Sequence, residues 1–441
     1  MAITFNRYLL MAKTEATFDE AETLSPANDA FEVIGPEPAP DISSQRREVG
    51  QASLSPAESF VTRRVGGLNF GVELKGNGVT PAGTTAPRIG RLLRACGFSE
   101  TSVTAAGDLL FRTVAGDSNT GGAISFTSDT PYDRRVFSKI KVEITSAGGS
   151  GTAVAEVTAP AEATYATGGF AKVDMTGVND VTLTDAAEVP VVDVDGNTVA
   201  SFTPSFGGGT ADLGDVYWLH FQPAGFQYLP ISDGIPSLTI AITLPDESGN
   251  SIRHTITGAR GTFTINAEIG GFPVINFEFT GTYIDQTDVA TPTGESFEST
   301  DPAQVQFAAL GFALRDDVKF TDVCANSWSI DLGGNVSPRD CINSQAATRG
   351  AIFTGREPTL SMDPEAILKA EYPVWSFLEK GLSLEWSARH GTVAGNTWAI
   401  HCPNAQITGI SYSDRNNIRV FNIDGSAARL SANDEIRLCA V

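Results

Sequence analysis

Histidine and cysteine are scarce in this chain, and the catalytic and metal-binding patterns that depend on them do not occur. The 441 residues include four His (His220, His254, His390, His401) and five Cys (Cys96, Cys324, Cys341, Cys402, Cys439). None has C-x-x-C, H-E-x-x-H or other metal-ligand spacing, and there is neither a G-x-S-x-G motif nor a phosphate-binding glycine loop. The sequence therefore predicts a protein that is not an enzyme, with no catalytic residue, no metal and no cofactor.

Basic residues are also few, with 30 Lys and Arg against 52 Asp and Glu and a formal net charge of −22. Binding to nucleic acid phosphates depends on clustered Lys and Arg, so this balance argues against tight DNA binding. A wide acidic passage that repels a duplex stays compatible with it. No run of about 18 apolar residues occurs, and the apolar stretch in MAITFNRYLLMAK is too short for a secretion signal, so we expect no membrane span and synthesis in the cytosol.

Two short patterns allow a chemical interpretation and a structural one. Segment 193–197 (DVDGN) is similar to part of a calcium loop, but Val191 stands where the first ligand should be and no closing Glu follows. A β-turn at Asp195–Gly196 is the preferred interpretation. His401 beside Cys402 could activate a thiolate, but a structural pair on a strand is favoured.

Glycine and alternating apolar residues are plentiful and predict a mainly β protein. The chain has 44 Gly and only 19% charged residues. Every second residue is apolar in 68–74, as in a strand with one buried face, and Pro87 to Gly97 shows the spacing of a short helix. Residues 1–50 are rich in proline and acid, which predicts an extended arm that does not pack.

The clearest local pattern is a β-hairpin in 252–284, in which two alternating strands flank the turn IGG at 269–271. The alternation assigns one set of side chains to the core: Phe263, Ile265, Ile275, Phe277 and Phe279. It assigns a polar set to the opposite face: Thr262, Thr264, Asn266, Asn276, Glu278 and Thr280. This second set is the candidate functional surface, although a plain solvated face would have the same pattern.

The same order of elements recurs near the C-terminus, with a strand over 356–363, a helix over 364–380 and a hairpin over 405–425. A shift of 144 residues superposes the hairpins, laying Phe263 on Ile407, Phe277 on Phe421, Phe279 on Ile423 and Gly281 on Gly425. The second core set is then Ile407, Phe421 and Ile423, and the second polar set is Gln406, Thr408, Asn422 and Asp424. Chance agreement of two hairpins is the alternative explanation.

The glycines that end the two helices, Gly97 and Gly381, lie further apart than the hairpins do, which predicts an insertion of about 140 residues in the first copy. The predicted organisation is an arm at 1–50, a first domain at 51–104 and 250–292, an inserted β domain or elaborated loop at 105–249, a linker at 293–312 and a second domain at 313–441. Between Lys172 and Arg253 the charged residues are all acidic, so we expect that block to face solvent. Plain solubility is the simpler interpretation of this charge.

Three stretches resemble the tail tube proteins of siphophages, the phages with long non-contractile tails. They are KTEATF at 13–18, RIGRLLRACGFSET from residue 88, and RHTITGARGTFTINAEIGGFPVINFEFTGTYIDQTDVATP at 253–292. The last is the most specific, because a G-A-R-G-T strand, a turn with Gly and Pro, and an F-E-F-T-G strand follow in order. The resemblance covers about 11–104 and 250–292, and it reaches the C-terminal copy only through its pattern.

The resemblance implies two tandem β-sandwich or barrel-like domains, each with a flanking helix, whose hairpins join those of neighbours around a lumen. The two polar sets of the hairpins are then the candidate lumen-facing residues. Because six such domains form a ring in most members, three chains would form a pseudo-sixfold ring. It further implies stacking of rings into a virion tail, assembly in the host cytoplasm, passage of double-stranded DNA without specific binding, and partners such as the tape measure, tail terminator and distal tail proteins. The alternatives are a distal tail or baseplate ring protein, and an adhesin with immunoglobulin-like domains.

Overall fold

The computed structural model describes residues 7–48, 50, 55, 58–78, 85–103, 110–114, 124–128, 137–158, 178–192, 196–298, 300–302, 307–314, 323–391, 393, 395–430 and 432–441. Strands make up 58% of it and helices 5%, which confirms the mainly β class. The predicted turn at Asp195–Gly196 lies partly outside these residues, because Asp195 is not among them, and Gly196 has a φ of 84°.

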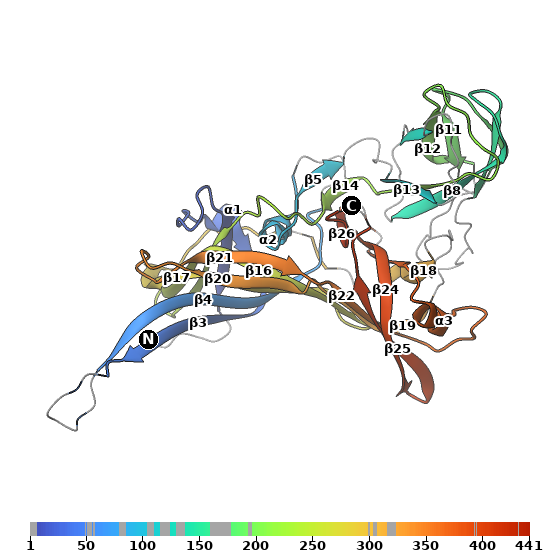
Figure 1. Ribbon diagram of the computed structural model, residues 1–441. Helices are drawn as coiled ribbons and strands as arrows, with labels where there is room; N and C mark the ends of the chain where they lie inside the picture. Colours follow the sequence, from blue (N-terminus) through green and yellow to red (C-terminus); the bar gives the residue numbers. More distant parts are fainter. Residues whose placement is uncertain are drawn as a thin grey trace.

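Sixteen of the described strands form one central sheet, which curves through the length of the molecule (Figure 1). They are β1 (Leu9–Thr14), β2 (Ala30–Phe31), β3 (Ile34–Arg46), β4 (Ser59–Glu73), β5 (Thr101–Val103), β14 (Gly225–Tyr228), β15 (Leu238–Pro245), β16 (Asn250–Glu268), β17 (Val274–Ala290), β18 (Phe307–Leu314), β19 (Ala325–Asp331), β22 (Thr359–Pro364), β23 (Leu384–His390), β24 (Trp398–Arg415), β25 (Ile418–Ala427) and β26 (Arg437–Ala440). The helices are α1 (Pro26–Asp29), α2 (Ile89–Ala95) and α3 (Val374–Lys380), and a separate hairpin joins β20 (Gly334–Asp340) to β21 (Thr348–Arg356).

Two sets of elements in this sheet share one pairing order. In the set that we name unit 1, β1 pairs with β15, β15 with β16, β16 with β17, β17 with β4, and β4 with β3. In unit 2, β18 pairs with β23, β23 with β24, β24 with β25, β25 with β22, and β22 with β19. The hairpin β20–β21 continues β19 and β22 outward, as the distal halves of β3 and β4 do in unit 1. A short helix follows β4 in unit 1 and β22 in unit 2.

Shared β-bulges fix the residue correspondence between the units, because a bulge marks one position in a ladder. The β3–β4 ladder shifts between Ser43 and Ser44, and β20–β21 shifts between Asn335 and Val336, so this hairpin corresponds at a spacing of 292 residues. The β15–β16 and β23–β24 ladders shift at Leu238 and Leu384 in the same way, a spacing of 146 residues. The predicted shift of 144 is therefore wrong.

One additional bulge in unit 2 explains why no single shift fits the whole hairpin. The β24–β25 ladder shifts between Ile407 and Gly409, so β24 holds one more residue than β16 from there on. The pair Tyr412–Phe421 corresponds to the pair Ile265–Ile275. Tyr412 lies 147 residues after Ile265, so the distal part of β24 corresponds to β16 at a spacing of 147, whereas β25 corresponds to β17 at 146.

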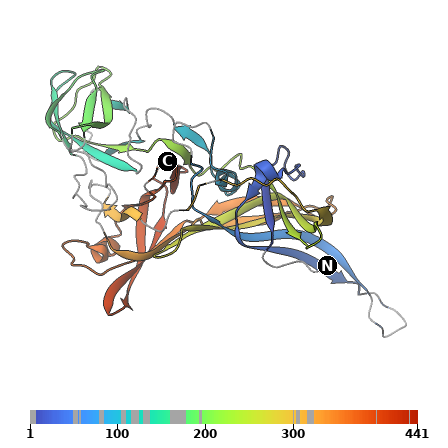
Figure 2. The same cartoon turned by 180° about the vertical axis from the view of Figure 1, so that it is seen from behind.

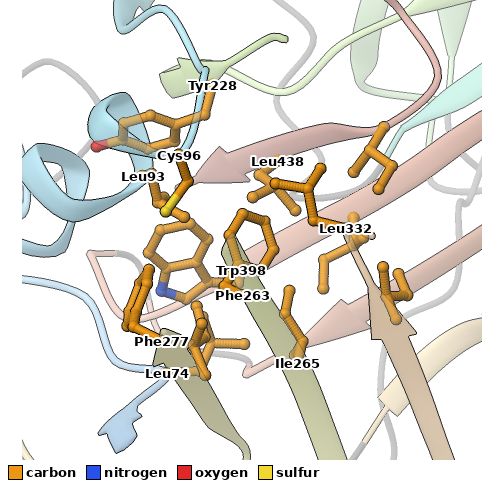
Figure 3. Close-up of a cluster of buried hydrophobic side chains, with 14 of the residues drawn as sticks. Leu74, Leu93, Cys96, Tyr228, Phe263, Ile265, Phe277, Leu332, Trp398 and Leu438 are labelled. Carbon is orange, nitrogen blue, oxygen red and sulfur yellow. The ribbon is translucent and has the colours of Figure 1, made fainter. Parts of the chain in front are cut away.

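The two units form one continuous sheet, because Thr264–Glu268 of β16 pair with Ser327–Asp331 of β19. We name this ladder the seam. A single hydrophobic core extends beneath both units: Phe263, Phe277 and Leu93 of unit 1 lie in the same cluster as Trp398 and Leu438 (Figure 3). The Tyr228 and Trp398 rings stack with centroids 6.0 Å apart.

A separate lobe lies between β5 and β14 and stands apart from the central sheet in both views (Figures 1 and 2). We name it the insert. It consists of β6 (Leu110–Val114), β7 (Ser125–Ser128), β8 (Ser138–Ser146), β9 (Ala153–Thr158), β10 (Val178–Leu183), β11 (Val189–Val192), β12 (Thr198–Ser205) and β13 (Val216–Phe221). Side chains from its five-stranded and three-stranded sheets share a second core. Most described acidic residues here are exposed as expected, but Asp215 is buried and accepts hydrogen bonds from Asp212 N and the Tyr217 hydroxyl.

Several predicted boundaries are wrong. The prediction of an unpacked arm at 1–50 is wrong for β1, which lies inside the sheet with Leu10 fully buried. Residues 40–48 are largely exposed and pair with β4 as far as Arg46. The insertion cannot extend to 249, because β14 and β15 belong to the central sheet, and 293–312 is not a linker throughout, because β18 begins at Phe307. The second helix covers only Val374–Lys380, since Pro364 is the last residue of β22 and pairs with Ala325.

Three prolines shape the outer edge of β3. Pro36, Pro38 and Pro40 alternate along this strand, which among the described residues pairs only with β4. Proline has no N–H, so the pairs that exchange two hydrogen bonds with β4 are those of the residues between them, Glu37 and Ala39. The backbone of the three prolines therefore faces away from β4.

Candidate functional surface and chain edges

The predicted polar residues lie on one face of the joined sheet, which we name the polar face. Register places Asn69, Glu278 and Thr262 in one row across β4, β17 and β16. A second row crosses the seam through Asn276, Thr264, Asp331, Thr359, Ser426 and Gln406. A third passes through Glu73, Val274, Asn266, Ser329, Ser361 and Asp424. The face is therefore continuous from unit 1 to unit 2.

The exposure of the ten predicted surface residues divides them into two groups. Asn266, Asn276, Glu278, Gln406, Thr408 and Asp424 are exposed, and Thr262, Thr264, Thr280 and Asn422 are half-buried. Thr262 is partly covered because its Oγ1 accepts a hydrogen bond of 3.0 Å from Gly334 N of β20. Thr408 lies in the bulge of β24 and so departs from strict alternation.

The predicted core residues all lie beneath this face. Phe263, Ile265, Phe277, Phe279, Ile407, Phe421 and Ile423 are each at most 5% exposed, and Ile275 is fully buried. The residue that corresponds to Phe263 is Ile410 rather than Ile407, because of the additional bulge in β24. Ile410 is half-buried against the core.

Carboxylates dominate the exposed charge of the polar face. Glu278, Asp331, Asp424 and Glu268 are exposed and lie on both sides of the seam. Arg415, at the end of β24, pairs with Asp363 and Glu365 at 3.5 Å and 3.1 Å, so its charge is locally compensated. A surface of this charge repels a nucleic acid duplex.

Two strand edges of the central sheet are the counterparts of the strands that meet at the seam. Within the described residues, β3 pairs on one side only, and β24 beyond Gln406 pairs only with β25. The side chains Ser411, Tyr412, Ser413 and Asp414 are all exposed on that part of β24. Unpaired edges of this length promote association unless another strand covers them.

A buried ionic cluster connects the insert to unit 2, and the sequence pattern did not indicate it. Lys139 of β8 lies 3.1 Å from the Glu385 carboxylate of β23 and donates to the Leu314 carbonyl at 3.0 Å. His401 and His220 lie 3.8 Å and 4.0 Å from the same carboxylate, and the Phe137 ring stacks on His401. These side chains come from separate regions of the chain, the insert (Phe137, Lys139 and His220) and unit 2 (Glu385 and His401), so the fold brings them together.

Burial determines the protonation of this cluster. Desolvation lowers the pKa of His220 to about 3, and it also lowers the pKa of His401, although Glu385 opposes both shifts. Burial raises the pKa of Glu385, but Lys139 and the histidines lower it more, so the carboxylate is ionised. Desolvation also raises the pKa of the Cys402 thiol, which is fully buried and unsuited to act as a thiolate nucleophile.

Glu15 is a second buried carboxylate, within the KTEATF stretch. It accepts hydrogen bonds from the Ser237 and Thr239 hydroxyls at 2.6 Å and 3.0 Å, and from the backbone N–H of Asp19 and Gly258 at 2.8 Å. It thereby ties the chain after β1 to β15 and to the bulge of β16. No sequence pattern connects Glu15 with these partners, so its role could not be predicted from the sequence.

No known protein family matches the sequence, and no curated protein is significantly similar to it. In the ranges that the structure describes, no group of three or more His, Cys, Asp or Glu side chains is arranged to hold a metal ion. None of the helices in those ranges is long and apolar enough to cross a bilayer.

Proposed function

We propose that this chain is a structural subunit of a bacteriophage tail tube, in which three chains form a ring of six similar units and rings stack around a lumen. The observation that carries the proposal is the seam. Within one chain, β16 of unit 1 pairs with β19 of unit 2. The strand that corresponds to β16 in unit 2 is β24, and the strand that corresponds to β19 in unit 1 is β3. Among the described residues, the distal part of β24 and the outer side of β3 are unpaired edges. Head-to-tail repetition of such a contact closes a ring when the rotation allows it.

The seam supplies a register for the contact between chains. Thr264 lies opposite Asp331 in the seam, and the residue correspondence translates this pair to Ser411 and Ala39. Both side chains are exposed on their edges. The same translation sets Ser413 of one chain opposite Glu37 of the next.

In such a ring the polar face lines the lumen, and the insert lies away from it. Exposed carboxylates such as Glu278 and Asp424 would repel DNA phosphates, so a duplex would pass without finding cationic sites that hold it. The resemblance to siphophage tail tube proteins adds the virion tail as the location and DNA ejection as the role. It also adds the tape measure, terminator and distal tail proteins as partners.

Electron microscopy of the purified chain tests the assembly. We expect tubes whose rings have threefold symmetry with six similar units. Rings with one chain per sixfold position would contradict the proposal, and rings that never stack would favour a distal tail or baseplate ring protein instead.

A cysteine pair tests the register. In a chain with Cys324→Ser and Cys341→Ser, which removes the two thiols that are not buried, Ala39→Cys with Ser411→Cys should form disulfides between chains on oxidation. Moving one cysteine to the exposed Leu213 of the insert gives the matched control. If the seam pair links no faster than the control, the chain edges do not meet in this register.

A further inference from the structure

The hairpin β20–β21, which we name the unit-2 arm, lies across unit 1 of the same chain. Its Asp340 forms an ion pair of 2.8 Å with Arg63, and the backbone N–H of Arg64 donates to the Ala346 carbonyl at 3.0 Å. Thr348 Oγ1 donates to the Arg64 carbonyl at 2.8 Å. The arm is thus held on β4 by backbone and side-chain bonds together.

The unit-2 arm lies in a gap of the central sheet. The β4–β17 ladder ends where Val65 pairs with Thr282, and beyond it the two strands diverge. The arm enters there, and Gly350 N donates to Thr282 Oγ1 at 2.6 Å. The approach is close, since a Cβ on Gly350 would lie 2.4 Å from the Phe18 ring. The unit-2 arm therefore fills the gap of unit 1.

Unit 2 has the corresponding gap, and there it is open. The β22–β25 ladder ends where Thr359 pairs with Ser426, and beyond this pair lies an open notch of about 750 Å³. Arg356, which corresponds to Arg64, lines it. Ala428, Asn433 and Glu435 also line it.

The element that corresponds to the unit-2 arm is the distal part of β3–β4, residues 40–48 and 58–64, which we name the unit-1 arm. It projects from the end of the sheet (Figures 1 and 2). Its apolar side chains face solvent, with Ile42 47%, Phe60 49% and Val61 56% exposed. In contrast Phe353, which corresponds to Val61, is half-buried against the main core, with its ring 3.6 Å from the position of a Cβ on Gly97.

We infer that the notch of one chain binds the unit-1 arm of a second copy of the chain. The unit-2 arm already shows how such an arm occupies such a gap, and the correspondence sets Glu58 of the arm beside Ala428 of the notch, as Gly350 lies beside Thr282. The open volume gives room for Glu58, which is larger than Gly350. The inference rests on the proposed function, because it applies the relation between units once more across the chain boundary.

Burial of exposed apolar surface favours this contact. By the correspondence with Phe353, Val61 would lose apolar area to the partner, and this area is costly to leave in water. Phe60 corresponds to Ile352, which is 39% exposed in the unit-2 arm, so we expect no comparable burial of Phe60. The arm and the strand edge of β3 belong to one hairpin, so the two contacts between chains would form together and strengthen each other.

Disulfide trapping tests the contact in the full-length chain. On the background with Cys324→Ser and Cys341→Ser, Glu58→Cys with Ala428→Cys should give oxidised species of two and three chains on a non-reducing gel. The control combines Glu58→Cys with Leu213→Cys. A monomer that carries an internal disulfide, or linkage no greater than in the control, would overturn the inference.

A second variant does not depend on disulfide geometry. Val61→Asp should raise the concentration at which chains assemble by at least about tenfold, because a charge would enter the contact. Thr62→Asp is the matched control, since the residue that corresponds to Thr62, Thr354, is exposed in the unit-2 arm. Equal assembly of both variants would count against arm binding.

The seam and arm experiments separate the two ideas. If Ala39→Cys with Ser411→Cys links chains but Glu58→Cys with Ala428→Cys does not, the ring proposal stands and the arm inference fails. If neither pair links chains and no rings form, the proposed function fails first.

Discussion

The buried pair between Lys139 and Glu385 allows a sharp stability prediction. Both side chains are at most 2% exposed, and Glu385→Gln replaces the carboxylate that lies 3.1 Å from the ammonium with a neutral amide. The Leu314 carbonyl would still accept one of its hydrogen bonds. Removing one member of a buried ion pair typically costs about 3–5 kcal/mol of unfolding free energy, because the other charge stays buried without compensation.

Denaturant unfolding of the unassembled subunit measures this cost. Trp218 reports on the site directly, since the Lys139 ammonium lies 5.3 Å from its ring centroid. We expect Glu385→Gln to lower the free energy of unfolding by about 3–5 kcal/mol. The double variant Lys139→Met with Glu385→Leu should restore most of it, because both members of the buried ion pair are then removed together. A loss below about 1 kcal/mol for Glu385→Gln would show that water reaches the pair. It would refute the interpretation that a buried ion pair holds the insert on unit 2.

Three further predictions address the histidines, the cores and a turn. The pKa of His220 is about 3 in the folded chain and about 6.5 in the unfolded chain, so the unfolded chain binds more protons below pH 6.5. His220 should therefore lower the free energy of unfolding by about 2 kcal/mol at pH 5. His220→Gln should make the free energy of unfolding less dependent on pH in this range, and an unchanged pH dependence would contradict the prediction. Phe277→Asp and Phe421→Asp should each abolish soluble folding, since the rings are 2% and 4% exposed, and a soluble, folded Phe421→Asp chain would count against a second packed unit. Asn417, at φ 65° in the turn between β24 and β25, should lose about 1–2 kcal/mol on change to Val and almost nothing on change to Gly, as thermal unfolding would show.

Sequence patterns predicted the elements that have one buried face. The strands β16 and β17 alternate, so their core residues and turn followed from periodicity alone. Strands buried on both faces do not alternate: β15 reads LTIAITLP and is buried almost throughout, so periodicity does not separate it from the predicted insertion. β1 is similar, with Leu10, Met11 and Ala12 buried in succession.

The relation between the units was harder to predict than their existence. Bulges at Leu238, Leu384 and Thr408 change the register by single residues, and nothing in the side chains at these positions marks them. The seam pairs β16 with β19, and the Lys139–Glu385 pair joins the insert to unit 2, so both depend on tertiary packing. For the same reason the polar face could be predicted strand by strand but not as one surface.

The prolines of β3 restrict which strands can pair with its outer edge. Pro36, Pro38 and Pro40 offer carbonyl acceptors to an approaching strand and no N–H donors. Two copies of β3 placed side by side would have acceptors facing acceptors, so a twofold dimer through this edge is disfavoured. A different strand that carries donors, such as the distal part of β24, can still pair with it. The edge therefore selects head-to-tail growth over symmetrical dimerisation, and it makes any contact between chains weaker in hydrogen bonds than the seam within each chain.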